Sequence, residues 1–446
     1  MNLRTLVWAL WLVLLGGLAL RLHDSFAHDT TALRRELSAY EEVRQKIAEN
    51  YVGEANSRDL LFGALEGMSR SLDAHSEFWT PKRRKDERSV TTGLFGGLGV
   101  EISRDPKKGL IVLRPLPGSP AAKAGLMPGD RIVEIDGTET LEIDVDRAKD
   151  LIRGQPGTIV RLGVHRQGHE ESLFFDVERA EIKIDSVQDV LILESPSGAG
   201  ARIPTGTPKI GYVFIVKFQE ATAADLDKAL QKLQAEGMQG FILDLRGNHG
   251  GLLDEALAVC ELFVKDGLIL TVRGRNGQSG THKDEEFLSN GVSHKGEFPM
   301  ALLVDGGSAS ASEIVAGCLK DRGRAVLVGE KTYGKGSVQT ILPIPLQDWG
   351  EAALKLTTGR FHSPSGAVID GKGVTPQHIV PLDQAQHIAL QRERYRRQVL
   401  RDAQNGGGIP PGFDRQGDGD PSEPFHDVQL EKAVELLTKE ITKRGG

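Results

Sequence analysis

The chain has 446 residues, of which 39% are apolar, 26% charged and 5% aromatic. This balance is typical of a folded globular protein with about three domains of ~150 residues each, and it excludes disordered and fibrous chains. The formal net charge of −7 gives no electrostatic basis for nucleic-acid binding. Two cysteines in the whole chain exclude a disulfide scaffold and a four-cysteine zinc site.

The first segment has the composition of an export signal. Residues 6–20 (LVWALWLVLLGGLAL) carry no charge and lie between Arg4 and Arg21, an arrangement typical of secretory signals. This run is shorter than the ~20 residues that usually span a bilayer. We therefore predict export to the periplasm or cell envelope, with residues 1–27 either cleaved as a signal peptide or retained as an anchor in the inner membrane.

Two helical patterns follow the signal. Apolar residues recur at steps of three and four between Leu33 and Tyr51, and again between Leu60 and Met68. These patterns predict an N-terminal helical region over residues 28–90.

Short strand patterns then replace the helical period. Apolar runs at 100–102, 110–113 and 131–135 and a hairpin at 159–164 and 172–177 predict a β-rich domain over residues 91–180. Helices are expected within it at 121–126 and 145–152.

Strands and helices alternate from Ile210 onward. The continuous apolar runs at 240–245, 300–304 and 325–328 are typical of strands buried on both faces of a parallel sheet. Helical patterns at 223–234, 252–263 and 312–320 lie between or beside them. We predict a mixed α/β core over residues 181–383, followed by a C-terminal tail over 384–446 with glycine- and proline-rich linkers and a last helix at 428–441.

Three serines follow the strand at 300–304, at positions 308, 310 and 312. A hydroxyl at a strand-to-helix junction can act as a nucleophile beside backbone amides that stabilise an oxyanion. Serine is also a favoured helix cap, and the three serines alone leave both interpretations open.

Lys335 lies between two glycines after an apolar strand, in the segment GKGSVQ. Desolvation there would lower its pKa and allow the neutral amine to act as a general base, which Gln339 could orient. The preceding residues match most of a phosphate loop, but Gly336 stands where that motif needs a hydroxyl, so nucleotide binding is excluded.

A glycine-rich turn, DLRGNHGG at 244–251, ends the strand at 240–245. Its adjacent Gly250 and Gly251 let backbone amides approach a reacting carbonyl, so this turn can complete an oxyanion hole.

Together these segments resemble the carboxy-terminal processing, or tail-specific, serine proteases that carry a PDZ domain. The similarity runs from about Tyr51 to Leu382. The motifs that carry it are LDAHS at 72–76, GGLGV at 96–100, GSPA at 118–121 with AGL at 124–126 and GD at 129–130, and the three segments at 244–251, 307–314 and 334–339.

The resemblance implies a ClpP/crotonase-like α/β core with an inserted PDZ domain and helical extensions at both ends. It also implies a serine endopeptidase that cleaves exported proteins near their C-termini. Ser310 matches the nucleophile, Lys335 the general base and Gln339 the residue that orients the lysine. The oxyanion hole would use the Ala311 amide and a glycine amide, with the choice left open between Gly250 and Gly251. A catalytically inactive PDZ scaffold is the alternative.

The PDZ resemblance places the C-terminal carboxylate of the substrate at the backbone amides of Gly97, Leu98, Gly99 and Val100. No metal and no cofactor are implied. The expected partners are the C-terminal tails of protein substrates, a second copy of the chain in a homo-oligomer formed through the flanking helices, and an adaptor protein.

The sequence departs from the family pattern at two positions. His249 stands where proline is usual, and His362 stands where an aromatic residue is more common; we interpret both as tolerated substitutions at the rim of the site. Cys260 and Cys318 are expected on core-facing helices, as buried thiols rather than a disulfide.

Overall fold

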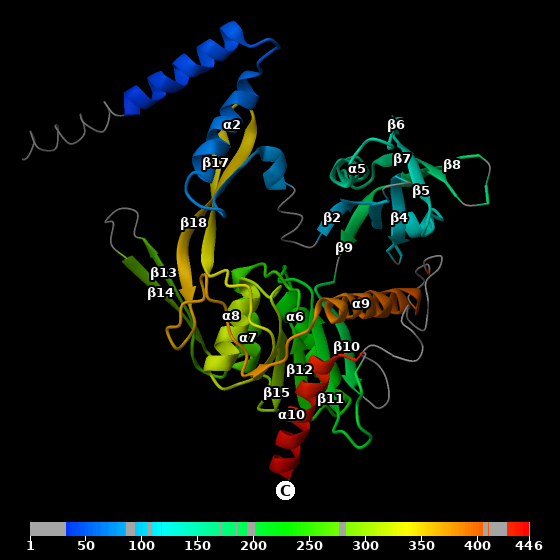
Figure 1. Cartoon of the computed structure of the whole chain (residues 1–446), viewed down its shortest axis with the longest axis vertical. Helices are drawn as coiled ribbons and strands as arrows, with labels where there is room; N and C mark the ends of the chain where they lie inside the picture. Colours follow the sequence, from blue (N-terminus) through cyan, green and yellow to red (C-terminus); the bar gives the residue numbers. More distant parts are fainter. Residues whose placement is uncertain are drawn as a thin grey trace, which may run out of the picture. The chain divides into compact units, whose positions relative to one another are not determined.

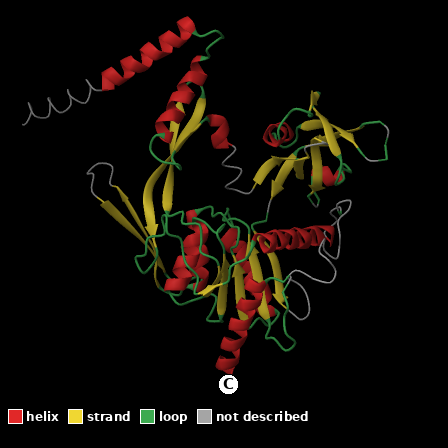
Figure 2. Cartoon of the chain, viewed as in Figure 1, coloured by secondary structure: helices red, strands yellow, loops and turns green. Residues whose placement is uncertain are grey.

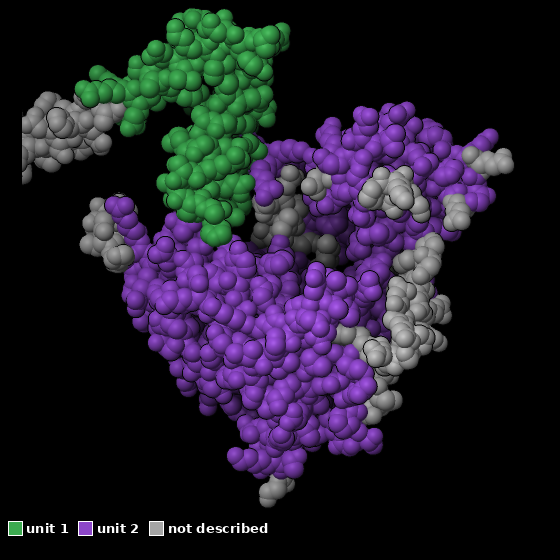
Figure 3. All heavy atoms as spheres, in the orientation of Figure 1, with its two compact units in different colours: residues 1–80, 342–356 green, residues 81–341, 357–446 purple. Residues whose placement is uncertain are grey.

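A computed structural model describes residues 33–85, 94–105, 109–116, 118–166, 168–169, 171–183, 185–193, 201–275, 282–404, 409 and 426–445. The predicted signal or anchor, residues 1–27, lies outside the described residues. Among the residues that are described, no helix is both long enough and apolar enough to cross a bilayer. The chain divides into two compact units, residues 1–80 with 342–356 and residues 81–341 with 357–446 (Figure 3).

Within its described residues, the first unit contains two helices, at 33–50 and at α2 (Ser57–Arg70), and the strand β1 (Glu77–Trp79). β1 pairs antiparallel with residues 353–355 of β18 (Gly350–His362). Phe62, Phe78 and Ala352 form its small buried core. The helical pattern predicted for residues 28–90 is confirmed for these two helices, although the region also contains a strand.

The second unit begins with a β-domain that corresponds to the predicted PDZ insert (Figure 1). β2 (Leu94–Gly97) pairs with β9 (Ala180–Lys183), and a separate sheet has the strand order β3-β4-β5-β7-β8, with β6 beside β5. Its strands are β3 (Val100–Asp105), β4 (Gly109–Pro115), β5 (Arg131–Ile135), β6 (Thr138–Glu139), β7 (Ile159–His165) and β8 (Leu173–Glu178). Its helices are α4 (Pro120–Lys123) and α5 (Val145–Ile152).

A six-stranded sheet organises the rest of the second unit, in the order β10-β11-β12-β15-β16-β19. β11, β12, β15, β16 and β19 pair in parallel, whereas β10 is antiparallel to β11. The strands are β10 (Val187–Leu193), β11 (Ile210–Ile215), β12 (Gly240–Asp244), β15 (Met300–Val304), β16 (Val326–Gly329) and β19 (His378–Ile379). The predicted mixed α/β core with buried parallel strands is confirmed.

Helices cover both faces of this sheet (Figure 2). Along β12, Phe241 and Leu243 join one core with α6 (Thr222–Ala235), α7 (Leu253–Phe263) and α8 (Ala311–Asp321). Ile242 points to the opposite core, which contains the apolar side of α10 (Val428–Gly445). The alternation of side chains along each strand therefore produces three layers.

The C-terminal helix α10 is part of this core. Leu430, Ala433, Val434 and Leu437 are at most 2% exposed. The expectation that its apolar stripe faces a partner chain is wrong, because the sheet of the same chain already buries that stripe. The preceding helix α9 (Gln384–Gln404) carries Arg394, which donates to the buried Asp244.

The remaining strands belong to another sheet, with the order β1-β18-β13-β14 and with β17 beside β18. β13 (Gly267–Arg275) pairs with β14 (His282–Ser289) and with residues 359–362 of β18, and β17 (Ser337–Leu346) pairs with β18. The predicted buried thiols are confirmed, since Cys260 on α7 and Cys318 on α8 are free and fully buried. Burial, together with the neighbouring Cys318, raises the pKa of Cys260.

Candidate active site

Ser310 occupies the junction between β15 and α8. It is the N-cap residue of the helix and is half-buried. Its φ of 56° and ψ of −114° place a residue other than glycine in a rare backbone conformation. Such strain persists only where the surroundings enforce it, and it concentrates at functional sites.

The two neighbouring serines have structural partners. Ser308 is buried and its hydroxyl donates to the Leu245 carbonyl at 2.8 Å, while the buried Ser312 hydroxyl donates to the Asn248 carbonyl at 2.8 Å. Both hydroxyls fasten the start of α8 to the glycine-rich turn. These structural roles of Ser308 and Ser312 were not evident from the sequence, and the role of Ser310 as nucleophile stays a prediction.

The Glu313 side chain binds backbone amides of both the serine segment and the lysine segment. Its carboxylate is 0% exposed; Oε2 accepts from the amides of Ser310 (2.9 Å) and Lys335 (2.8 Å). Oε1 accepts from the Gly334 amide at 2.7 Å and the Thr332 hydroxyl at 2.5 Å. Four donors saturate this buried anion, as a buried charge requires. The carboxylate therefore brings the two segments, distant in sequence, to one point.

The glycine-rich turn lies directly against Ser310. A Cβ added to Gly250 would be 2.8 Å from Ser310 Cβ and 2.9 Å from the Ala311 nitrogen. Ala311 is the first residue of α8, so its amide has no partner within the helix. The turn thus presents backbone beside both the serine and an amide of the kind that stabilises an oxyanion.

The two candidate glycines of the oxyanion hole differ. The Gly250 amide donates to Asn248 Oδ1 at 2.9 Å and is used within the turn. Gly251 packs on the Phe218 backbone, where an added Cβ would lie 1.8 Å from the Phe218 carbonyl oxygen. Asn248 also accepts, at its carbonyl, the Ala309 amide at 3.0 Å. Both glycines are therefore fixed by close backbone contacts that exclude a side chain.

Lys335 is half-buried and lies two residues before β17, whose third residue is Gln339. Gln339 Nε2 donates to the hydroxyls of Ser337 (2.9 Å) and Thr357 (3.4 Å). The structure places Gln339 on the strand that leaves the lysine, and its orientation of the lysine amine stays a prediction.

A buried ionic cluster supports the glycine-rich turn. Asp244 and Arg246 are both 0% exposed, and Arg246 Nη2 contacts Asp244 Oδ2 at 2.7 Å. Burial alone would raise the pKa of Asp244, but Arg246 and Arg394 hold that pKa well below its usual range. Burial, with the Asp244 charge, raises the pKa of Tyr212, whose hydroxyl donates to Asp244 Oδ2 at 2.7 Å.

The predicted carboxylate-binding loop joins β2 to β3. Gly97 ends β2, Val100 begins β3, and Leu98 between them is 1% exposed. Gly99 has a φ of +65°, and a Cβ there would lie 2.5 Å from Ser119 Cβ. Among the described strands β3 is at the edge of its sheet, so it can accept an added peptide strand.

The two unusual histidines lie in different environments. His249 is exposed on the glycine-rich turn, as expected for a rim position. His362 is 7% exposed at the end of β18, and its Nδ1 has no hydrogen-bond partner in the described part of the chain. It is thus more enclosed than a rim residue.

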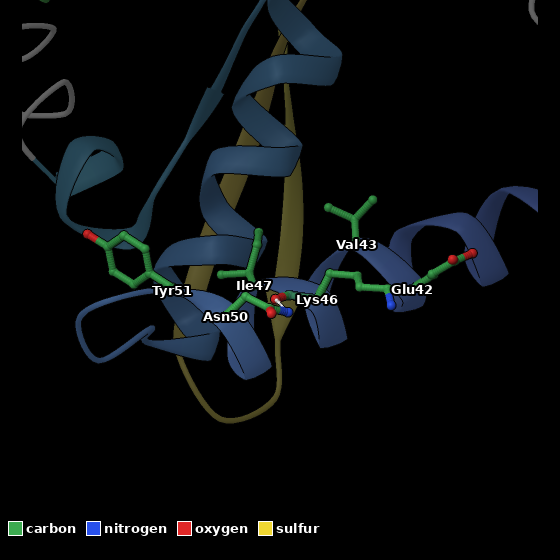
Figure 4. Close-up of a pocket in the computed structure, with 6 residues that line it drawn as sticks. All are labelled: Glu42, Val43, Lys46, Ile47, Asn50 and Tyr51. Carbon is green, nitrogen blue, oxygen red and sulfur yellow. Dashed lines mark hydrogen bonds between the residues drawn. The ribbon is translucent and has the colours of Figure 1, made fainter.

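A pocket on the helix at 33–50 contains none of the predicted site residues (Figure 4). It is lined by Glu42, Val43, Lys46, Ile47, Asn50 and Tyr51. The candidate site instead consists of the three segments around Ser310.

Sequence reasoning missed the residues that join these segments. Glu313 could have been found, because a Glu three positions after a helix-capping serine matches the capping box. Asn248 and the partners of Arg246 gave no such local signal.

Comparisons with known proteins agree with the predicted family. Residues 209–380 match peptidase family S41, and residues 111–166 match the PDZ domain. A carboxy-terminal-processing protease of Bartonella bacilliformis is 35% identical over 420 residues, which cover 92% of this chain and 89% of that protein. The processing protease CtpB of Bacillus subtilis is 33% identical over 345 residues, covering 77% of this chain and 67% of that protein. Among solved structures, the photosystem II D1 C-terminal processing protease is 30% identical with a TM-score of 0.43, covering 76% of this chain and 86% of that one.

Proposed function

The chain belongs to the carboxy-terminal processing proteases of peptidase family S41, serine-type peptidases with a PDZ domain, and we propose that it cleaves exported proteins near their C-termini with Ser310 and Lys335. The observation that carries the assignment of these residues is the shared Glu313 carboxylate, which binds the amides of both. Gln339 orients the lysine amine.

The chemistry follows from these roles. Neutral Lys335 removes the proton from the Ser310 hydroxyl as the oxygen attacks the peptide carbonyl. The Ala311 amide and a glycine amide of the turn stabilise the resulting oxyanion, and Gly251 is the better candidate because the Gly250 amide already donates to Asn248. The lysine then gives the proton to the departing amine, and water hydrolyses the acyl-enzyme with the lysine again as base. The proposed overall core type, ClpP/crotonase-like, is supported by the parallel βαβ succession from β11 to β16.

The PDZ domain binds peptide tails of protein substrates. We propose that the Gly97–Val100 loop holds the terminal carboxylate while the tail adds to the edge of β3. A purified chain should therefore cleave an unstructured tail with a free C-terminus, and cleave the same tail less efficiently when its C-terminus is amidated. Equal cleavage of both tails would contradict carboxylate recognition. Binding without cleavage, even with cell extract added, would instead support the inactive scaffold.

Export and self-assembly complete the proposal. The apolar segment at 6–20 supports a periplasmic or envelope location, with a cleaved signal or an inner-membrane anchor.

Leu33, Leu37 and Val43 on the helix at 33–50 are more than half exposed, at 54%, 58% and 59%, which supports a homo-oligomer through this helix. Light scattering of the triple variant to serine should show a smaller mass than the unaltered chain. An unchanged mass would exclude that helix as the interface.

A further inference from the structure

We propose that Asp427, which precedes α10 near the C-terminus, is a positioning residue that holds the glycine-rich turn in its catalytic geometry through Arg246. The inference rests on the proposed function, since it assumes that this turn forms part of the active site. It gives the C-terminal segment a role in the reaction beyond filling the core.

The Arg246 guanidinium is completely enclosed by acceptors from two distant parts of the chain. Nε donates to Asp244 Oδ1 at 3.0 Å, and Nη2 donates to Asp244 Oδ2 and to Asp427 Oδ2, both at 2.7 Å. Nη1 donates to Asp427 Oδ1 and Gln429 Oε1, both at 2.9 Å. All five N–H groups of the side chain are thus satisfied, with three of the bonds supplied by the segment at 427–429.

Asp427 supplies one of the two carboxylates that bind Arg246. Arg246 is 0% and Asp427 1% exposed, and the second cation, Arg394, donates to Asp244 Oδ2 at 2.8 Å. Two buried or nearly buried carboxylates therefore face two guanidinium groups. Neutralising Asp427 leaves an excess positive charge where water does not reach, and breaking a buried pair in this way is strongly unfavourable.

Contacts of the turn that follows Arg246 link this residue to Ser310 within a few positions. The Arg246 carbonyl accepts from Arg394 Nη1 at 2.9 Å, and two positions later the Asn248 carbonyl binds the Ala309 amide and the Ser312 hydroxyl, on either side of Ser310. Gly250 then lies against Ser310 Cβ. A shift of the Arg246 side chain would therefore displace the backbone of the glycine-rich turn, which lies beside the proposed oxyanion.

The test compares two full-length variants. Asp427→Asn keeps the shape of the side chain and removes its charge. Val434→Ala is the matched control, because Val434 lies on α10, the helix that Asp427 precedes, is 2% exposed and packs in the apolar core. Hydrogen exchange of the peptide at 244–251 measures the turn without reference to activity. Cleavage of one tail peptide gives kcat and KM, and a peptide aldehyde, which forms a tetrahedral adduct with serine, measures oxyanion stabilisation.

We expect Asp427→Asn to accelerate exchange in the turn, to lower kcat by about tenfold or more and to weaken aldehyde binding by a similar factor, with KM changed less than about twofold. Val434→Ala should lower the melting temperature but leave exchange in the turn, kcat and aldehyde affinity within about twofold. If Asp427→Asn does not fold, Gln429→Met, which removes one acceptor of Arg246 and the bond to the Val380 carbonyl but no charge, should show the same pattern at about threefold to tenfold.

Three outcomes would overturn the inference. They are unchanged exchange in the turn of the folded variant, a loosened turn with unchanged kcat, and a control that loses kcat and aldehyde affinity as much as Asp427→Asn. An unaltered chain that does not cleave tails, while Asp427→Asn still loosens the turn, would refute the proposed function and leave the structural half of the inference standing.

Discussion

The backbone amides of Ser310 and Lys335 donate to the same oxygen atom, Oε2 of the buried Glu313, at 2.9 Å and 2.8 Å. A residue at the first turn of α8 thereby fixes the serine and the lysine segments relative to each other. Positioning of this kind removes much of the entropic barrier to a reaction between two groups.

We predict that Glu313→Gln lowers kcat by about a hundredfold, because the amide NH₂ replaces one acceptor with a donor that faces backbone donors, and an unpaired buried polar group costs about 1–3 kcal/mol. Steady-state cleavage and a melting curve measure both effects. Glu330→Gln is the matched control, since Glu330 also accepts a backbone amide, that of Leu382, at 2.7 Å. Equal losses of kcat in the two variants would contradict the special role of Glu313.

Gly250→Ala should abolish cleavage and destabilise the chain. The added Cβ would lie 2.7 Å from the Ala309 carbonyl oxygen, and φ is +98°. Gly366→Ala separates the two effects, because its φ is +81° while nothing lies within 4 Å of the added Cβ. The control should lose only about 1 kcal/mol from the strained φ and keep its activity. Cleavage by Gly250→Ala at the rate of the control would refute the contact with Ser310.

The PDZ loop offers an independent test at Gly99. Gly99→Ala should raise KM for a tail peptide by about tenfold, since the Cβ would collide with Ser119 in the loop whose amides we propose to bind the carboxylate. Gly109→Ala, with φ of +81° and open space around its Cβ, is the control. Hydrolysis of a small ester that lacks a tail should be unchanged in both variants. An unaltered KM in Gly99→Ala would contradict tail binding at this loop.

The low pKa of Asp244 predicts how stability depends on pH. A carboxylate whose pKa is lower in the folded than in the unfolded chain stabilises the fold fully above the unfolded value, ~3.9, and loses this contribution as the pH falls toward the folded value. The difference in unfolding free energy between the unaltered chain and Asp244→Asn should be constant from about pH 8 to 5 and shrink below about pH 4. Denaturant unfolding at several pH values measures it. A difference that shrinks between pH 7 and 5 would contradict the lowered pKa.

Local sequence signals located most of the core. The helix predicted at 145–152 and the strand predicted at 300–304 have those bounds in the structure, because one buried face imposes a clear periodicity on each. The burial of α10 was not predicted, since an amphipathic pattern shows that a helix has an apolar face without showing what covers it.

The contacts that hold the candidate site together were harder to predict from the sequence. The segments with Ser310 and Lys335 were recognised by their motifs, whereas the Asp427 contact joins residues 181 positions apart. Such a contact depends on the fold and leaves no local spacing. The same holds for Ser308 and Ser312, whose structural roles emerge only when the glycine-rich turn lies beside α8.

Side-by-side cleavage of one tail peptide by the unaltered chain, Ser310→Ala and Lys335→Ala tests the central claim most directly, with tail binding measured in parallel. The Ser310–Lys335 mechanism predicts that both variants bind the tail as the unaltered chain does and that cleavage falls by about a thousandfold or more. Undiminished cleavage by either variant would contradict the mechanism.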